Sequence, residues 1–214
     1  MKDHASTKPL LLLDIDGVLN AFPPRAGKEY SRLTIDGYPI HLHHEAPAMV
    51  SALEQAFEIV WFTLWNHRAA PGFGPHVGLR DVEHLTTSWE RGWEAAAAAG
   101  YGDPEIRQLM YAKTPLLPGL VDPQRPWVWI DDAHTRWDQE YLETAGLDPR
   151  DFRLIGTEAE VGLTWEHVQR AIGFARAEVR ELSKEPLSDN PPVAPRFPGS
   201  VVGRMDAVDD DDIG

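Results

Sequence analysis

Two pairs of aspartates stand directly after apolar segments, and they are the residues best suited to chemistry. Asp14 and Asp16 close the stretch LLLDID, and Asp131 and Asp132 close the stretch VWIDD. Residues two apart in an extended chain point to the same side, so the carboxylates of Asp14 and Asp16 are expected to lie close together. Such carboxylates repel each other unless a cation or a proton holds them, which favours a metal site or separate acid and base roles. The alternative is a turn that uses Asp and Gly for their loop propensity.

The second pair of aspartates strengthens the metal interpretation. Three or four carboxylates that converge on one edge of a sheet suit a hard cation such as Mg²⁺, which prefers oxygen ligands. A helix-capping role could explain either Asp131 or Asp132. It does not explain why both follow an almost wholly apolar segment.

Thr63 and Lys113 are candidates for binding the oxygens of an anionic group. Thr63 ends the apolar stretch WFT, where its hydroxyl can donate a hydrogen bond to an anionic oxygen. Lys113, in YAKTPLL, would act as a fixed positive charge beside a transferring phosphoryl group. Each has an ordinary alternative, because β-branched residues commonly end strands and most lysines are solvated on the surface.

Alternating apolar segments and helical patterns predict the elements that would position these residues. Four short apolar runs indicate buried strands, at Lys8–Leu13, Glu58–Thr63, Trp127–Ile130 and Phe152–Ile155. Helices are predicted over Ala46–Phe57, from a Ser88 cap to Gly100, over Asp103–Tyr111, and from a Thr164 cap to about Leu182. This alternation is typical of an α/β fold with a mainly parallel sheet covered on both faces. In such sheets the chemistry gathers at the carboxyl ends of the strands.

The remaining segments are predicted to be a hairpin, a loop and a tail. RLTIDGYPIHLH has two β-prone arms around Asp36-Gly37, which predicts a small hairpin flap within about residues 21–45. Residues 67–86 are predicted to be loop. Residues 1–185 would form one domain, and the Pro-rich, acidic stretch 186–214 is predicted to be a disordered tail.

Taken in order, these motifs resemble the haloacid-dehalogenase (HAD) hydrolase superfamily over roughly residues 8–175. LLLDIDGVL is similar to its first motif, WFTLWN to the second, Lys113 to the third and VWIDD to the fourth. More narrowly, the Trp-rich second strand, the KTP segment and VGLTWEHV resemble the small HAD domain of Swiss Army Knife RNA-repair proteins. The resemblance implies a Rossmann-like, three-layer α/β/α fold.

The spacing of the motifs departs from relatives that carry large caps. The segments between the first three motifs supply a hairpin and short helices, too little for a large cap domain. The site is therefore expected to be open, which favours a substrate with a bulky body, such as the phosphate end of a macromolecule. A small metabolite would fit if the flap and the 67–86 loop close over it.

The resemblance also implies roles for the candidate residues in phosphomonoester hydrolysis. Asp14 would attack phosphorus to form an aspartyl-phosphate and would also bind Mg²⁺. Asp16 would protonate the leaving oxygen, then activate water, and its backbone carbonyl would bind the metal. Asp131 would be a direct metal ligand, and Asp132 a second one, bound either directly or through water.

Five further side chains are expected around the phosphate and the substrate. By the same resemblance, Thr63 and Lys113 would hold the phosphoryl oxygens. Asn20, Trp65 and Asn66 lie beside the motifs and are predicted to line the mouth through which substrate enters. The alternative from another class is a HAD-fold binding or regulatory domain without turnover, and transfer to an acceptor other than water would use the same residues.

Composition narrows the partners and the compartment. The net charge of −14 argues against strong non-specific binding to nucleic acid, so the expected partner is a phosphorylated small molecule or a nucleic-acid end. The absence of Cys excludes disulfides, thiolate metal sites and a Cys nucleophile. No apolar run is long enough to cross a membrane, which predicts a soluble cytoplasmic protein. His41 and His43 share a strand face, but a solvated hairpin face is favoured over a metal site there.

Overall fold

The computed structural model describes residues 8–103 and 110–182. The predicted tail, 186–214, lies outside these residues, and so does most of the predicted helix Asp103–Tyr111. The two described ends of that helix, Asp103 and Met110–Tyr111, are not helical.

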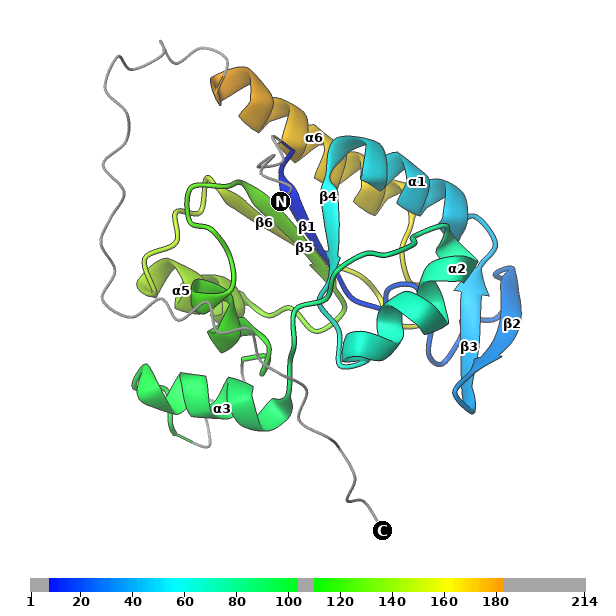
Figure 1. Cartoon of the computed structure of the whole chain (residues 1–214), viewed down its shortest axis with the longest axis horizontal. Coiled ribbons are helices and arrows are strands. Elements are labelled where there is room, and N and C mark those ends of the chain that lie inside the picture. Colours follow the sequence, from blue (N-terminus) through cyan, green and yellow to red (C-terminus); the bar gives the residue numbers. More distant parts are fainter. Residues whose placement is uncertain (1–7, 104–109, 183–214) are drawn as a thin grey trace.

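A four-stranded parallel sheet forms the centre of the fold, in the order β4-β1-β5-β6 (Figure 1). The strands are β1 (Leu10–Leu13), β4 (Glu58–Trp61), β5 (Trp127–Asp131) and β6 (Phe152–Gly156). Leu13 of the central strand β1 pairs with Trp61 on one side and with Ile130 on the other. This register brings the ends of three strands together at one edge of the sheet, and the four predicted strands are confirmed.

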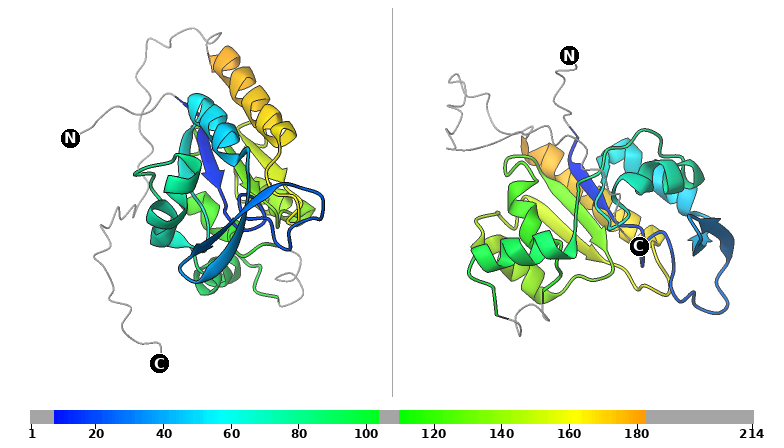
Figure 2. Two further views of the ribbon diagram at one scale, coloured as in Figure 1. Left: turned by 90° about the vertical axis from the view of Figure 1, so that its right-hand side faces the viewer. Right: turned by 60° about the horizontal axis from the view of Figure 1, so that its bottom comes forward.

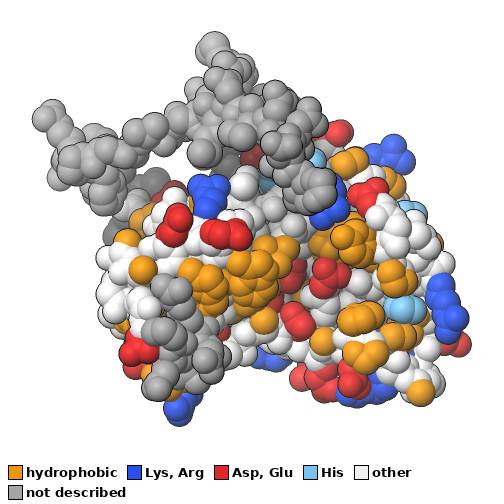
Figure 3. Space-filling model, turned by 90° about the horizontal axis from the view of Figure 1, so that it is seen from below, with side chains coloured by type: hydrophobic (Ala, Val, Ile, Leu, Met, Phe, Trp, Pro, Cys, Tyr) orange, Lys and Arg blue, Asp and Glu red, His pale blue; other side chains and the backbone are white. Residues whose placement is uncertain are grey.

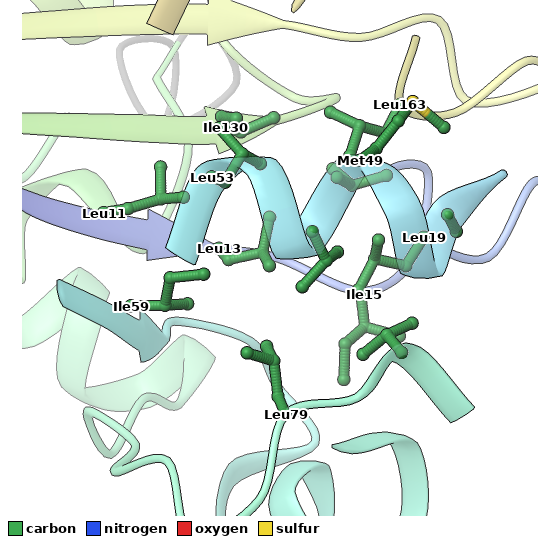
Figure 4. Close-up of a cluster of buried hydrophobic side chains, with 14 of the residues drawn as sticks. Leu11, Leu13, Ile15, Leu19, Met49, Leu53, Ile59, Leu79, Ile130 and Leu163 are labelled. Carbon is green, nitrogen blue, oxygen red and sulfur yellow. The ribbon is translucent and has the colours of Figure 1, made fainter. Parts of the chain in front are cut away.

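Helices cover both faces of this sheet, because consecutive strand residues point to opposite faces. Leu11 and Leu13 belong to the hydrophobic cluster under α1 (Ala46–Ala56) and α6 (Trp165–Leu182) (Figure 4). Leu12 belongs to the second cluster, which includes residues of α3 (Trp89–Ala98) and α5 (Arg136–Thr144). The α/β/α layering expected from the sequence is therefore confirmed.

The predicted hairpin is present as β2 (Tyr30–Ile35) and β3 (Tyr38–His43), an antiparallel pair beside the sheet (Figure 2). Asp36 and Gly37 both have positive φ, +50° and +81°, as a two-residue hairpin turn of this hand requires. Ile40 and Leu42 are buried and join the cluster under α1. The hairpin is thus anchored by its apolar face, and it is the flap expected in place of a large cap.

The prediction of a loop over residues 67–86 is wrong for its first half. A short 3-10 turn (Asn66–Arg68), a π-helical turn (Ala69–Phe73) and α2 (Gly74–Val77) follow one another there. Phe73 and Val77 are buried and hold this segment against the core. Gly74, one of the glycines that suggested a loop, serves close packing instead, since a Cβ there would lie 2.2 Å from the carbonyl oxygen of Leu79.

Helix α5 and the 3-10 helix Thr114–Gly119 were also not predicted, whereas α1, α3 and α6 match their expected signals. Ser88 caps α3 by accepting the Arg91 N–H at 3.1 Å. Thr164 precedes α6, where its N–H donates to Nδ1 of His167 at 3.2 Å. Among the described helices, none has the length and apolar character needed to cross a membrane.

Candidate active site

The carboxyl edge of the sheet gathers the aspartates singled out from the sequence. Asp14 follows β1 directly, and its N–H donates to the carbonyl of Ile130 at 3.1 Å, which continues the ladder to the neighbouring strand. Asp131 ends that neighbouring strand, β5. The strands point downward in Figure 1, and Figure 3 looks onto this edge, where acidic side chains lie among hydrophobic ones.

Asp14, Asp131 and Asp132 form an acidic cluster in which one oxygen of each lies within 4.8 Å of the others. Asp14 and Asp131 are buried, at 4% and 0% exposed, while Asp132 is partly buried. Within the described part of the chain this is the one group of three side chains arranged to hold a metal ion. His41 and His43 belong to no such group, and His43 stacks instead on His44 and meets Tyr30 edge-on.

Lys113 is buried between two of these acids. Its Nζ lies 3.0 Å from Oδ2 of Asp14 and 2.5 Å from Oδ2 of Asp131, and it donates to the carbonyl of Phe62 at 2.9 Å. The Tyr111 ring, with its centroid 4.9 Å from Nζ, closes the ammonium in from one side. Two carboxylates thus balance the charge of this buried ammonium, as its burial requires.

The acidic cluster holds three carboxylates but only one ammonium, and burial makes their ionisation costly. Burial raises the pKa of Asp14 to about 7, although Lys113 opposes the shift. Burial likewise raises the pKa of Asp131 and of Asp132. Burial alone would lower the pKa of Lys113, but Asp131 and Asp14 together hold it above its ordinary value. One ammonium among three carboxylates leaves room for a further cation with oxygen ligands, and Mg²⁺ fits that donor set.

Asp16 is not one of the three members of the acidic cluster. It is exposed, and its Oδ1 accepts the side-chain N–H of Asn20 while its Oδ2 accepts the indole N–H of Trp65, both at 2.8 Å. Asn20 also accepts the backbone N–H of His41 from β3 at 2.9 Å. Asn20 therefore fixes the carboxylate of Asp16 and the hairpin to each other.

Thr63 and Asn66 lie on the turn after β4. Thr63 is buried, and its carbonyl accepts the hydroxyl of Thr87 at 3.2 Å. Asn66 donates to the carbonyl of Thr87 at 3.0 Å and accepts its N–H at 2.8 Å. These bonds join the turn after β4 to the loop that carries Thr87. Asn20 and Trp65 line a pocket at the hairpin.

The four motifs and their geometry can be compared with known proteins. Residues 10–168 match a family model described as the HAD domain in Swiss Army Knife RNA repair proteins. The chain belongs to this family. The resemblance inferred from the motifs is confirmed, and the HAD domain covers the sheet, the acidic cluster and Lys113.

Two solved structures show a weaker likeness to this HAD domain. One is a proposed 3-deoxy-D-manno-octulosonate 8-phosphate phosphatase from Vibrio cholerae, with 13% identity, a TM-score of 0.34, and coverage of 81% of this chain and 86% of that one. The other is a hypothetical protein from Xanthomonas campestris, with the same identity and score and coverage of 82% and 89%. A comparison with curated proteins gives no match.

Gly17 is a residue of the HAD site that sequence reasoning did not single out. Its φ is +72°, and a Cβ there would lie 2.2 Å from Cγ of Asp132. Its carbonyl accepts the hydroxyl of Thr157 at 2.7 Å, and the N–H of Thr157 donates to the carbonyl of Asp131 at 3.1 Å. Glycine thus lets the loop after Asp16 pass directly beneath the Asp132 carboxylate. Its place in the DIDG stretch was the available signal.

Asp138, on α5, was also missed. This fully buried carboxylate accepts hydrogen bonds from the N–H of Tyr111 at 2.8 Å, the hydroxyl of Thr114 at 2.5 Å, and both the N–H and the hydroxyl of Thr135, at 2.6 and 2.8 Å. Tyr111 and Thr114 flank Lys113, so α5 holds the segment that carries the ammonium. Thr135 and Asp138, three residues apart, form a capping box that the sequence could have revealed.

Proposed function

We propose that this HAD domain hydrolyses phosphomonoesters in the presence of Mg²⁺ and that the phosphoryl group passes through Asp14. The observation that carries the proposal is the buried contact of Lys113 with both Asp14 and Asp131, next to Asp132. A nucleophilic carboxylate, a fixed cation and a set of oxygen ligands lie together there, and family membership links that set to the HAD motifs.

The carboxylates of Asp14, Asp131 and Asp132 would hold the metal, together with the backbone carbonyl of Asp16. Bound there, Mg²⁺ would supply positive charge that offsets the repulsion between carboxylates and phosphate. The raised pKa values of Asp14, Asp131 and Asp132, each caused first by burial, support this assignment. They indicate carboxylates that are ionised at a cost until more positive charge is present.

Asp14 is the proposed nucleophile. An oxygen of its carboxylate attacks phosphorus, the bond from phosphorus to the leaving oxygen breaks, and an acyl phosphate forms on the side chain. The ion pair with Lys113 fixes the direction of that carboxylate, because Oδ2 is held at 3.0 Å. The positive charge of Lys113 also offsets the negative charge of the phosphoryl oxygens, and the hydroxyl of Thr63 is the proposed further donor to them.

Asp16 is the proposed acid and base. It gives a proton to the leaving oxygen in the first step and takes one from the water that attacks the acyl phosphate in the second, which releases inorganic phosphate and restores Asp14. The bonds from Asn20 and Trp65 orient the carboxylate for both transfers. Its exposure allows it to meet the leaving group on one side and water afterwards.

The narrower proposal is that the phosphate is carried by a nucleotide or by the end of a nucleic acid. The description of the family as a domain of RNA-repair proteins supports it. So does the small hairpin, which leaves space for a large leaving group. The net charge of −14 limits the affinity for a long polyanion and favours contact with its end alone.

Hydrolysis of an aryl phosphate with and without Mg²⁺ tests the proposal. Asp14→Asn is expected to abolish turnover, and Asp16→Asn is expected to lower kcat by roughly 10²- to 10⁴-fold, the usual range for general acid–base catalysis. Asp36→Asn is the matched control, since Asp36 lies at the hairpin turn with φ +50°, a conformation that Asn also tolerates. Turnover by Asp14→Asn at the wild-type rate would overturn the role of Asp14. A wild-type protein that neither hydrolyses any phosphomonoester nor binds beryllofluoride with Mg²⁺ would favour a non-catalytic domain.

A further inference from the structure

A pocket of about 360 Å³ adjoins Asp16 between the hairpin and the turn after β4. The residues around it that matter here are Asp16, Phe22, Tyr38, Leu64, Trp65 and Arg68. In the proposed mechanism Asp16 protonates the leaving oxygen, so the body of the leaving group must lie on the side of the nucleophile where Asp16 stands. This inference therefore rests on the proposed function and concerns what that leaving group is.

Aromatic side chains form much of this pocket. Phe22 and Tyr38 are 61% and 53% exposed, and both are among the few large hydrophobic residues in the described part of the chain that face solvent to this extent. The rings of Tyr38 and Trp65 meet edge-on with centroids 5.6 Å apart. Exposed aromatic faces beside a polar group are typical of sites that bind planar rings.

Arg68 adds a positive charge at the same place. Its guanidinium carbon lies 5.4 Å from the Trp65 ring centroid and 6.0 Å from the Tyr38 ring centroid. In the parts of the chain that the structure describes, no carboxylate forms an ion pair with it. A guanidinium held by ring contacts keeps its N–H donors available for acceptor atoms on a ligand.

Hydrogen bonds anchor the backbone around this pocket. The side chain of Asn20 joins Asp16 to β3, the N–H of Ala21 donates to the carbonyl of His41 at 3.0 Å, and the N–H of Phe22 donates to the carbonyl of Ala159 at 2.8 Å. Both exposed rings therefore stand on anchored backbone, which reduces the entropy lost when a ligand packs on them.

We propose that this pocket binds the nucleobase of a phosphomonoester substrate, so that the leaving group is a nucleoside. The base packs against Tyr38 and Phe22, Arg68 donates to its acceptor atoms or to a neighbouring phosphate, and the phosphorylated oxygen lies at Asp16. A planar ring that carries acceptors matches both the aromatic walls and the guanidinium, and an aliphatic body matches neither. The same chemistry is offered by a free nucleotide and by the terminal nucleotide of a strand.

Two substrates of different shape test the pocket in one protein. We expect Tyr38→Ala to lower kcat/KM for adenosine 5′-monophosphate roughly tenfold, the scale of one base stacked on an aromatic ring, and to leave kcat/KM for glycerol 2-phosphate unchanged. Tyr38→Phe keeps the ring and is expected to restore the nucleotide value. Trp165→Ala is the control, because Trp165 is another exposed aromatic residue that lies outside the pocket.

Two further substrates distinguish a free nucleotide from the terminal nucleotide of a strand. Oligonucleotides with a 5′- or a 3′-phosphate should lose the same factor in Tyr38→Ala, and their kcat/KM relative to the mononucleotide tells whether strand ends or free nucleotides are preferred. Phenyl phosphate or a phosphotyrosine peptide hydrolysed better than both would overturn the proposal. So would an equal loss on glycerol 2-phosphate, which would indicate damage to the fold.

Binding of a ligand without phosphate separates this inference from the proposed function. Calorimetric titration of wild-type protein with adenosine should give measurable binding that is lost in Tyr38→Ala and kept in Tyr38→Phe. If phosphomonoesters are hydrolysed but Tyr38→Ala changes no ratio and adenosine does not bind, the base pocket is refuted and the catalytic proposal stands. If adenosine binds as expected but no phosphomonoester is hydrolysed, the catalytic proposal fails and the pocket remains.

Discussion

Gly17 shows how closely the backbone passes beneath the acidic cluster. The position of a hypothetical Cβ, 2.2 Å from Cγ of Asp132, lies well inside van der Waals contact. The two nearest atoms belong to the Asp132 carboxylate, but Cβ of Asp132, which is fixed to the backbone, also lies only 2.6 Å away. A substitution there should therefore displace the Asp132 carboxylate and also cost stability, because the backbone at Asp132 must shift.

Gly17→Ala is expected to lower kcat/KM for an aryl phosphate at least tenfold because it displaces the Asp132 carboxylate from the proposed metal site. Its cost in the free energy of unfolding should exceed the roughly 1 kcal/mol of placing a Cβ at positive φ, because Cβ of Asp132, 2.6 Å away, must also move. Gly27→Ala is the matched control, since Gly27 has φ +81° and no atom within 4 Å of its Cβ position. Activity assays and urea denaturation of both variants check this.

Gly17→Ala is expected to lose more stability than Gly27→Ala and, where both proteins are folded, to have the lower activity. Equal activity in both would show that Asp132 is dispensable or that its carboxylate has another place to bind. Equal stability in both would mean that the Asp132 side chain alone makes room for the added methyl group.

At this scale the sequence identified the reactive groups better than the residues that position them. Asp14, Asp131 and Lys113 were found from the ends of apolar runs and from the motif order, and the structure brings their charged atoms together. Gly17 and Asp138 were not found. Their contacts join positions far apart in the chain, as the bond of Asp138 to Tyr111 does, and no local pattern records such a pairing.

The elements of the fold divide the site into two halves. Strands β1 and β5 deliver Asp14 and Asp131 through their shared register, which is fixed by a ladder of buried residues. Lys113 comes from no strand and stands at the start of the 3-10 helix Thr114–Gly119. Its place depends on α5, which reaches it through Asp138.

Asp138→Ala is expected to reduce both stability and kcat, because it removes all four hydrogen bonds and frees the segment around Lys113. Loss of a buried carboxylate with backbone and hydroxyl donors left unpaired should cost about 3 kcal/mol or more in the free energy of unfolding. Activity at saturating Mg²⁺, measured well below the unfolding temperature, should fall through kcat rather than KM if Lys113 is misplaced.

Asp148→Ala is the control for this substitution. Asp148 also accepts several hydrogen bonds, all from Arg150 in its own exposed turn. Its loss should change stability little, as for other exposed pairs, and should leave kcat unchanged. An Asp138→Ala protein with wild-type kcat would show that Lys113 holds its position without α5.

Periodicity predicted the regular elements well and the irregular ones poorly. The four buried strands and α1 had continuous or periodic apolar patterns, so their bounds agree within two residues. The segment Asn66–Val77 contains two glycines and a pair of prolines, which indicate a loop unless the packing is known. Its helical turns form because Ala69, Phe73 and Val77 find apolar partners, a tertiary effect that local preference cannot supply.

For the whole molecule, the acidic balance and the buried acids act in the same direction. In a protein of net charge −14, repulsion between the acidic side chains opposes folding. Asp14 and Asp131 add to this repulsion because they are buried away from water. Bound cations relieve both effects. The stability of the HAD domain should therefore depend on pH and on Mg²⁺ together.

The metal-free protein is expected to lose stability as pH rises from 5 to 8. Asp14, which faces Lys113, Asp131 and Asp132, has a pKa raised by burial from 3.8 to about 7, so between these values the folded state binds a proton that the unfolded chain has released. Stability falls where the folded state holds more protons, and the loss from this residue is about 3 kcal/mol over that range.

Buried histidines have the opposite effect on stability as pH rises. The role of Asp14 is therefore tested by the difference in the free energy of unfolding between wild type and Asp14→Asn. Burial lowers the pKa of His134 to about 3, and a histidine kept neutral in the fold adds stability as pH rises toward 6.5. Urea denaturation in a chelator should show the wild-type protein losing about 3 kcal/mol relative to Asp14→Asn between pH 5 and pH 8. Added Mg²⁺ should restore the wild-type protein at pH 8 far more than the variant, because the ion binds the ionised acids of the folded state. Parallel pH curves for the two proteins would mean that Asp14 is ionised in the fold throughout, with Lys113 alone sufficient to balance it.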